Sequence, residues 1–152
     1  MIRIALATLL LTSPTFAQDV ARDSGTCTDG ALWWKSGTAA GFGPCEAPED
    51  GFFVLSCTDG TTTLAVKSPY PIAEAQRGTV DLTVDGRLWR LEGRGVMQEA
   101  TGTIGLDGIT VPEDALTALA RGSAASLDMP TEYRPFHLTG SGAAITALTD
   151  GC

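Results

Sequence analysis

Short runs of alternating apolar and polar residues, separated by Asp-Gly dipeptides, recur along the chain. The clearest example is residues 80–91, in which two alternating runs flank Asp85-Gly86. Glycine tolerates the positive φ of a type I′ turn, so this pattern predicts a two-residue β-hairpin. The predicted cross-strand pairs are Val80–Leu91 and Leu82–Trp89 on one face of the sheet, and the opposite-charge pair Asp81–Arg90 on the other.

The same reasoning predicts a second hairpin over residues 52–67, with its turn at Asp59-Gly60. We expect a third hairpin over residues 103–111, with its turn at Asp107-Gly108, and later strands over residues 124–129 and 134–139. The expected pairs of the second hairpin are Phe53–Val66, Leu55–Leu64 and Cys57–Thr62, which places Cys57 on the core face.

Two short helices are predicted among the strands of the C-terminal half. The first spans residues 112–121, where proline and two acidic residues begin the helix and Arg121-Gly122 ends it. The second spans residues 142–149, with Ser141 as its N-cap. The predicted fold class is α+β, mainly β, with about eight antiparallel strands in hairpins. These strands form a sandwich or a half-open barrel on which the two helices dock.

The N-terminus has the pattern of a signal peptide. Arg3 precedes an apolar stretch over residues 4–11, and Thr15-Phe16-Ala17 places small residues at positions −3 and −1 of a cleavage site. The apolar stretch is far shorter than the roughly 20 residues that span a bilayer. We therefore expect residues 1–17 to be a signal peptide and residues 18–152 to form a single domain, located in the periplasm or secreted.

The charge balance of the chain is acidic. Removing residues 1–17 takes away Arg3 and no acidic residue, which changes the formal net charge from −8 to −9. Such a surface repels nucleic-acid phosphates and anionic lipid headgroups. We expect neither nucleic-acid binding nor membrane insertion.

Four cysteines lie in the predicted mature domain, at positions 27, 45, 57 and 152. An even number in an exported chain indicates disulfides, and the lack of a C-x-x-C pair, together with a single histidine, argues against zinc. Three pairings can be drawn. We favour Cys27–Cys45, which closes a local glycine-rich loop, and Cys57–Cys152, which fixes the C-terminal residue to a central strand.

Motifs for catalysis or cofactor binding are missing from the sequence. There is no G-x-S-x-G nucleophile elbow, and Gly140-Ser-Gly lacks the third glycine and the lysine of a phosphate-binding loop. His137, in Phe136-His-Leu, is interpreted as a strand residue. We therefore predict no catalytic residue, no cofactor and no metal site.

Two aromatic residues are candidates for a contact surface. Trp33 and Trp34 are adjacent, so on a strand one side chain points inward and the other outward. An outward Trp34 marks a contact site, unless the glycine-rich loop over residues 37–43 folds over it. Tyr70, in Ser68-Pro-Tyr-Pro, is the second candidate, with a packing role as its alternative.

The C-terminal half resembles the invasion-associated locus B family of secreted alphaproteobacterial proteins. The matching segments are residues 111–122, Phe136-His-Leu-Thr-Gly and residues 143–148. A cysteine pair usual before the first helix of that family is absent from residues 96–112. The resemblance implies a β-rich periplasmic or secreted protein that acts by contact, and it implies no site residues.

A second resemblance, over Val54-Leu-Ser-Cys57-Thr-Asp-Gly, is to inhibitors of c-type lysozyme. Our hypothesis is a non-enzymatic, macromolecule-binding or envelope-associated module whose partner is an envelope or extracellular protein. The alternatives are an inhibitor of a lysozyme-type enzyme, recognised by an exposed rigid loop, and a small hydrolase. The hydrolase would need His137 in a cleft beside a carboxylate and a hydroxyl.

Overall fold

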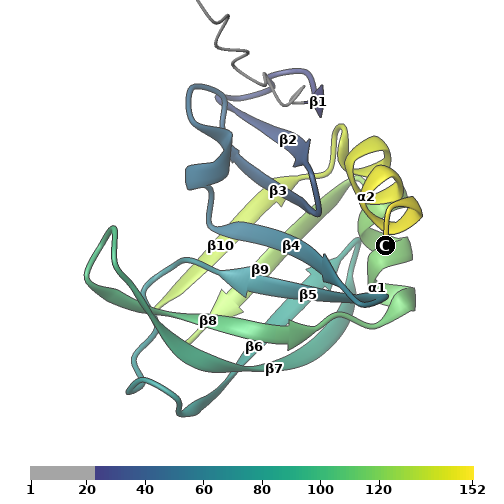
Figure 1. The fold of residues 1–152 in the computed structure, drawn as a ribbon. Coiled ribbons are helices and arrows are strands. Elements are labelled where there is room, and N and C mark those ends of the chain that lie inside the picture. Colours follow the sequence, from purple (N-terminus) through teal and green to yellow (C-terminus); the bar gives the residue numbers. More distant parts are fainter. Residues whose placement is uncertain (1–22) are drawn as a thin grey trace, which may run out of the picture.

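The structure, a computed structural model, describes residues 23–152, which form ten strands in one antiparallel sheet (Figure 1). The predicted signal peptide, residues 1–17, lies outside the described residues. The strands are β1 (Asp23–Ser24), β2 (Ala31–Ser36), β3 (Ala39–Pro44), β4 (Phe53–Thr58), β5 (Thr61–Val66), β6 (Arg77–Val84), β7 (Arg87–Gln98), β8 (Thr103–Thr110), β9 (Ala124–Met129) and β10 (Glu132–His137).

The predicted fold class is confirmed: the chain is mainly β, and the sheet curls into a half-open barrel. The strand order is β1-β2-β3-β4-β5-β8-β7-β6-β9-β10. Strands β1 and β10 are the two edges, so within residues 23–152 no backbone ladder closes the barrel. The sheet has ten strands where the sequence predicted about eight, because β1, β2 and β3 are added and the two strands expected over residues 103–111 form one.

Two α-helices lie together at one end of the curled sheet (Figure 1). They are α1 (Glu113–Arg121) and α2 (Ser141–Asp150), and a short 3-10 helix, η1 (Pro48–Asp50), follows β3. Helix α2 contacts β2, β3 and β4, and α1 contacts β6. Neither helix is long and apolar enough to cross a membrane, and the same holds for every helix within residues 23–152.

The hairpin at Asp85-Gly86 has the predicted register. The pairs Val80–Leu91, Asp81–Arg90 and Leu82–Trp89 all form. Asp85 and Gly86 have φ values of 45° and 85°, as a type I′ turn requires. The hairpin at Asp59-Gly60 is also confirmed, and its pairs are Phe53–Val66, Leu55–Leu64 and Cys57–Thr62.

The third predicted hairpin, at Asp107-Gly108, is wrong. Residues 103–110 form one continuous strand, β8, which pairs with β7 on one side and β5 on the other. On the β5 side the register shifts between Leu64 and Val66, and Gly108 has a φ of 66°. The dipeptide therefore forms a β-bulge, in which glycine again supplies the positive φ. Two neighbouring strands hold β8 extended through this point.

The core fills the inside of the curled sheet and the space beneath the two helices. Its strand residues follow the predicted alternation. In β6, Val80, Leu82 and Val84 are buried, whereas Asp81 and Thr83 between them are only half-buried. The largest side chains with less than 2 % exposure are Trp33, Phe53, Leu55, Leu64, Leu82, Leu106, Ile109, Leu119, Leu127, Ile145, Leu148 and Val66.

Helix α2 begins one residue earlier than predicted, and Ser141 is not its N-cap. Gly140, with a φ of 90°, occupies the cap position. The Ser141 side chain is buried, and its Oγ lies 2.7 Å from the carbonyl oxygens of both Leu119 and Leu138. A hydroxyl that donates its proton toward these carbonyls ties the two helices together, so it cannot cap α2. Ile145 and Leu148 face the core as predicted.

The disulfides are Cys27–Cys45 and Cys57–Cys152, with Cα–Cα distances of 5.7 and 5.6 Å. These are the pairs that the loop-closure argument favoured. Cys57 faces the core from β4, and its bond to the C-terminal residue holds the end of α2 against the sheet.

The Asp81–Arg90 ion pair predicts a pH effect on stability. Arg90 donates from Nε and Nη2 to the two Asp81 oxygens, both at 2.8 Å. This hydrogen bonding lowers the pKa of Asp81, against a smaller opposing effect of burial. Because the folded pKa lies below the unfolded one, the contribution is full above the ordinary Asp pKa of about 3.9 and is lost as the pH falls through the folded pKa.

We therefore expect Asp81→Asn to lose less free energy of unfolding than the wild type between about pH 6 and about pH 2.5. Urea unfolding at the two pH values measures this difference. Asp59→Asn, at an exposed turn aspartate that forms no ion pair within residues 23–152, is the control for removing one carboxylate outside the Asp81–Arg90 pair. Equal pH dependence in the wild type and Asp81→Asn would contradict the prediction.

Candidate functional site

The structure buries Trp34, so the prediction that this residue is an outward contact site is wrong. Its side chain is 8 % exposed. Gly41 lies directly across from it on β3, and a Cβ on Gly41 would come within 3.0 Å of the indole ring. The indole thus lies over backbone that has no side chain, in agreement with the alternative that the glycine-rich segment covers it.

Tyr70 is also buried, which makes the second contact-site prediction wrong. The residue is 8 % exposed, and its hydroxyl donates to the Thr79 carbonyl and accepts from the Thr79 amide. Its ring lies against Gly78, where a Cβ would approach to 2.8 Å. Tyr70 therefore fixes the segment before β6 to the sheet, which is the packing alternative.

Within residues 23–152, the two sides of the open barrel are joined by side-chain contacts and not by a backbone ladder. We call the line where β10 faces β2 and β3 the seam. Trp33 Nε1 donates to the His137 carbonyl at 3.0 Å, and His137 Nε2 lies 3.0 Å from the Thr28 carbonyl. The His137 ring also stands edge-on to Phe42, with 4.9 Å between ring centroids. These contacts fix the orientation of His137 at one end of the seam.

Phe136 is the centre of the aromatic packing across the seam. It projects from β10 toward the other side, and its ring centroid lies 5.2–6.3 Å from four other aromatic rings. Those rings are Trp33, Phe42, Phe52 and Phe53. Because the barrel has no closing ladder, this packing substitutes for one.

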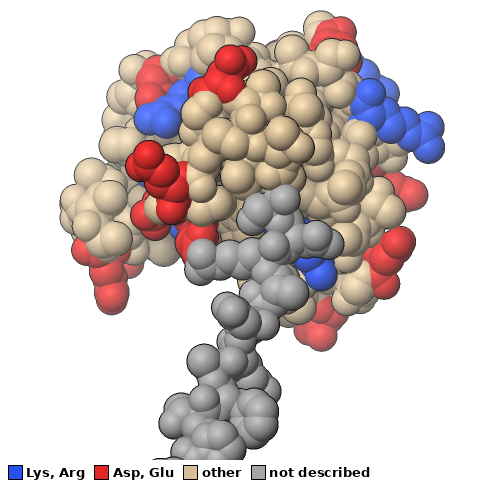
Figure 2. All heavy atoms as spheres, turned by 90° about the horizontal axis from the view of Figure 1, so that it is seen from above, with Lys and Arg blue, Asp and Glu red and all other residues tan. Residues whose placement is uncertain are grey.

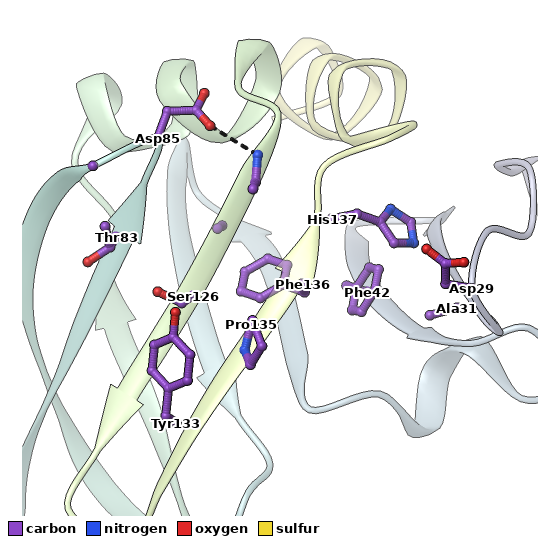
Figure 3. A pocket seen from close by; sticks show the side chains of 13 residues that line it. Asp29, Ala31, Phe42, Thr83, Asp85, Ser126, Tyr133, Pro135, Phe136 and His137 are labelled. Atoms are coloured by element: carbon purple, nitrogen blue, oxygen red, sulfur yellow. Dashed lines mark hydrogen bonds between the residues drawn. The ribbon is translucent and has the colours of Figure 1, made fainter.

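A depression of about 630 Å³, which we call the seam cleft, opens beside these contacts (Figure 3). Most of its lining is apolar. A second hollow, of about 340 Å³, adjoins it and shares Ala31 and Phe42. The seam cleft is lined by Asp29, Ala31, Phe42, Thr83, Asp85, Gly86, Ala124, Ala125, Ser126, Tyr133, Pro135, Phe136 and His137.

Tyr133 and Pro135 form the exposed side of the seam cleft on β10. Successive strand residues point to opposite faces, so both residues point outward while Phe136 points into the core. Tyr133 is 64 % exposed, the largest exposed fraction among the large hydrophobic side chains of the described chain. An aromatic ring this exposed beside an apolar cleft is typical of a binding surface.

The charged residues that line the seam cleft are all acidic. Asp85 accepts hydrogen bonds from the amides of Ser123 and Ala124, so its carboxylate also orders the start of β9. Asp29 is exposed and has no hydrogen bond or ion pair within residues 23–152. Figure 3 shows Asp29 at the His137 end of the cleft and Asp85 at the other end. Acidic side chains are also spread around the face shown in Figure 2.

The edge of β10 is poorly suited to pairing with another strand. The turn after Met129 has two residues, so Glu132, Arg134 and Phe136 bond to β9 while Tyr133, Pro135 and His137 direct their backbone groups outward. Pro135 has no N–H to offer, and the His137 carbonyl is already bonded to Trp33. Proline at such a position prevents continuous strand addition.

His137 lines the seam cleft with the Asp29 carboxylate at the same end, but within residues 23–152 neither ring nitrogen is hydrogen-bonded to a carboxylate or a hydroxyl. Its Nε2 donates to a carbonyl, and its Nδ1 is buried with no hydrogen-bond partner in the described part of the chain. Within residues 23–152 no group of three or more His, Cys, Asp or Glu side chains is placed to hold a metal ion.

The residues of the seam cleft were not identified from the sequence. Asp29, Asp85 and Tyr133 are separated by long stretches of chain, and only the curling of the sheet brings them to one depression. One signal was available, because Pro135 within a strand pattern indicates an edge strand. With Phe136 facing inward, the alternation then places Tyr133 outward at that edge.

Comparison with known proteins gives one structural similarity. No family model matches the chain, and no curated protein matches it. Among solved structures, the crystal structure of invasion associated protein B from Bartonella henselae is similar, with 18 % identity and a TM-score of 0.40. The match covers 84 % of this chain and 90 % of that chain.

Proposed function

We propose that this protein is a non-enzymatic binding module of the periplasm or the extracellular space. In this proposal the seam cleft holds an exposed polypeptide segment of another exported protein. The observation that carries the proposal is the apolar cleft along the unclosed seam, with the exposed aromatic ring of Tyr133 at its side. Two disulfides support an oxidising compartment.

The mode of binding follows from the edge of β10. A segment that extended the sheet would need a regular series of donors and acceptors, and Pro135 interrupts it. Side-chain contacts to Tyr133, Pro135 and Phe42 remain available, because all three line the cleft. The module therefore recognises side chains of its partner and does not add a strand.

A photo-crosslinking experiment tests the proposal. Tyr133 is replaced by benzoylphenylalanine, and the protein is exported in cells that naturally produce it and irradiated. Met97 is the control position because it is 46 % exposed, lies near the far end of β7 and does not line the cleft. We expect a discrete crosslinked protein from position 133 and none from position 97.

Equal crosslinking from both positions, or none from position 133, would contradict the proposal. The identified partner then allows a quantitative test with Tyr133→Ala. We expect this change to weaken binding about 10- to 30-fold, because exposed aromatic residues at the centre of interfaces contribute about 1.4–2 kcal/mol or more. Met97→Ala should leave the dissociation constant unchanged, as measured by calorimetry.

A further inference from the structure

We infer that the segment bound in the seam cleft is basic, with a lysine or arginine whose cationic group lies at Asp29 and whose aliphatic stem lies along the cleft. This inference rests on the proposed function and specifies the chemistry of the partner. It is carried by the charge and the polarity of the cleft lining.

The cleft offers negative charge without a cation to balance it. Its lining includes two aspartates and no lysine or arginine. The Asp85 carboxylate is bonded to two backbone amides, whereas the Asp29 carboxylate has no partner in residues 23–152. Asp29 is therefore the group that can accept hydrogen bonds from an incoming cation.

The rest of the lining suits the stem of a long basic side chain. Lysine and arginine place their methylene groups along apolar surface while the charged head reaches a polar group. Ala31, Phe42 and Pro135 provide such a surface between Tyr133 and the Asp29 end of the cleft. An acidic side chain in the same path would face Asp29 and be repelled.

The net charge of the whole chain also favours a basic partner. The formal net charge of −8 attracts a basic partner over a distance and repels an acidic one. The adjoining hollow differs, because Lys67 and Arg134 line it together with Asp50. The preference for a basic residue therefore belongs to the Asp29 end of the seam.

The chain contains a matched control for Asp29. Asp59 is also exposed, also precedes a glycine in a two-residue turn, and has a φ of 50° where Asp29 has 52°. Asp59 does not line the seam cleft. Asp29→Asn and Asp59→Asn therefore each remove one negative charge from the same position of the same kind of turn. Only Asp29→Asn removes a charge from the seam cleft.

The test uses ¹⁵N-labelled protein purified after export and three blocked pentapeptides, Gly-Leu-X-Leu-Gly, in which X is lysine, norleucine or glutamate. Amide shifts of Ala31, Ser126, Tyr133 and His137 report binding at about 20 mM salt. We expect the lysine peptide to bind about two- to fivefold more tightly than the norleucine peptide, and the glutamate peptide to bind most weakly. Asp29→Asn should abolish the preference, and Asp59→Asn should retain it.

The inference is overturned if the three peptides bind equally, if none shifts these amides, or if Asp59→Asn removes the preference as fully as Asp29→Asn. It is also overturned if butylammonium alone shifts the same amides as strongly as the lysine peptide, which would indicate a small-amine site. A crosslinked partner at position 133 without any charge preference would leave the proposed function standing. Failure of the crosslink would remove both.

Discussion

Loss of the Cys57–Cys152 disulfide should lower the free energy of unfolding by about 4.7 kcal/mol in the chain-entropy model. The bond joins residues separated by 95 positions, so the reduced unfolded chain gains the freedom of a very long loop. It also holds the end of α2, whose Ile145 and Leu148 are buried in the core. Guanidinium chloride unfolding of the double variant Cys57→Ala/Cys152→Ser, compared with the wild type, measures the loss.

The second disulfide provides the control for this prediction. Cys27 and Cys45 are separated by only 18 positions, for which the same model gives about 3.2 kcal/mol. The Cys27→Ser/Cys45→Ser variant should therefore be the more stable of the two double variants. The reverse order would show that loop length does not govern the contribution of these bonds.

Replacing Phe136 by alanine should cost about 3–5 kcal/mol of stability and loosen the seam. The ring is 6 % exposed and contacts four aromatic rings on the other side of the seam. Since no backbone ladder joins these two sides, the cavity left by the change lies where the barrel has least support. Guanidinium chloride unfolding gives the stability. Hydrogen exchange of the Trp33 indole, which is bonded to the His137 carbonyl, reports opening of the seam.

Tyr133→Ala is the matched control, because it removes a ring from the same strand at a position that is 64 % exposed. An exposed substitution of this kind should change stability by no more than about 0.5 kcal/mol. If Tyr133→Ala were as destabilising as Phe136→Ala, the assignment of inward and outward faces on β10 would be wrong. With the expected result, the loss of binding in Tyr133→Ala can be attributed to the cleft.

Turn chemistry and alternation made two hairpins predictable from the sequence. At Asp85-Gly86 and Asp59-Gly60, the turn and both strands lie in one continuous stretch of chain, residues 77–98 and 53–66, so local preferences fix the register. At Asp107-Gly108 the same dipeptide forms a bulge, because β5 and β7 pair with β8 on both sides. The local signal is the same in all three places, and the neighbouring strands decide whether the chain turns.

Trp34 and Tyr70 are buried by residues from other strands, which the local alternation pattern around each of them does not include. Alternation correctly implies that Trp33 and Trp34 face opposite sides of β2. Gly41 covers the face of Trp34, and the Thr79 backbone binds the Tyr70 hydroxyl. An aromatic side chain that points away from the core is therefore not necessarily exposed.

Local sequence patterns were enough to predict the mainly β fold class, the two helices and the register of two hairpins, and they favoured the disulfide pairs that the structure contains. The open edge of the sheet at β10, and the cleft shared by Asp29, Asp85, Tyr133 and His137, became visible only in the folded chain. This difference follows from the range of the interactions. Turns and strand alternation depend on neighbours along the chain, whereas the seam depends on aromatic contacts between residues about a hundred positions apart, such as Trp33 and Phe136.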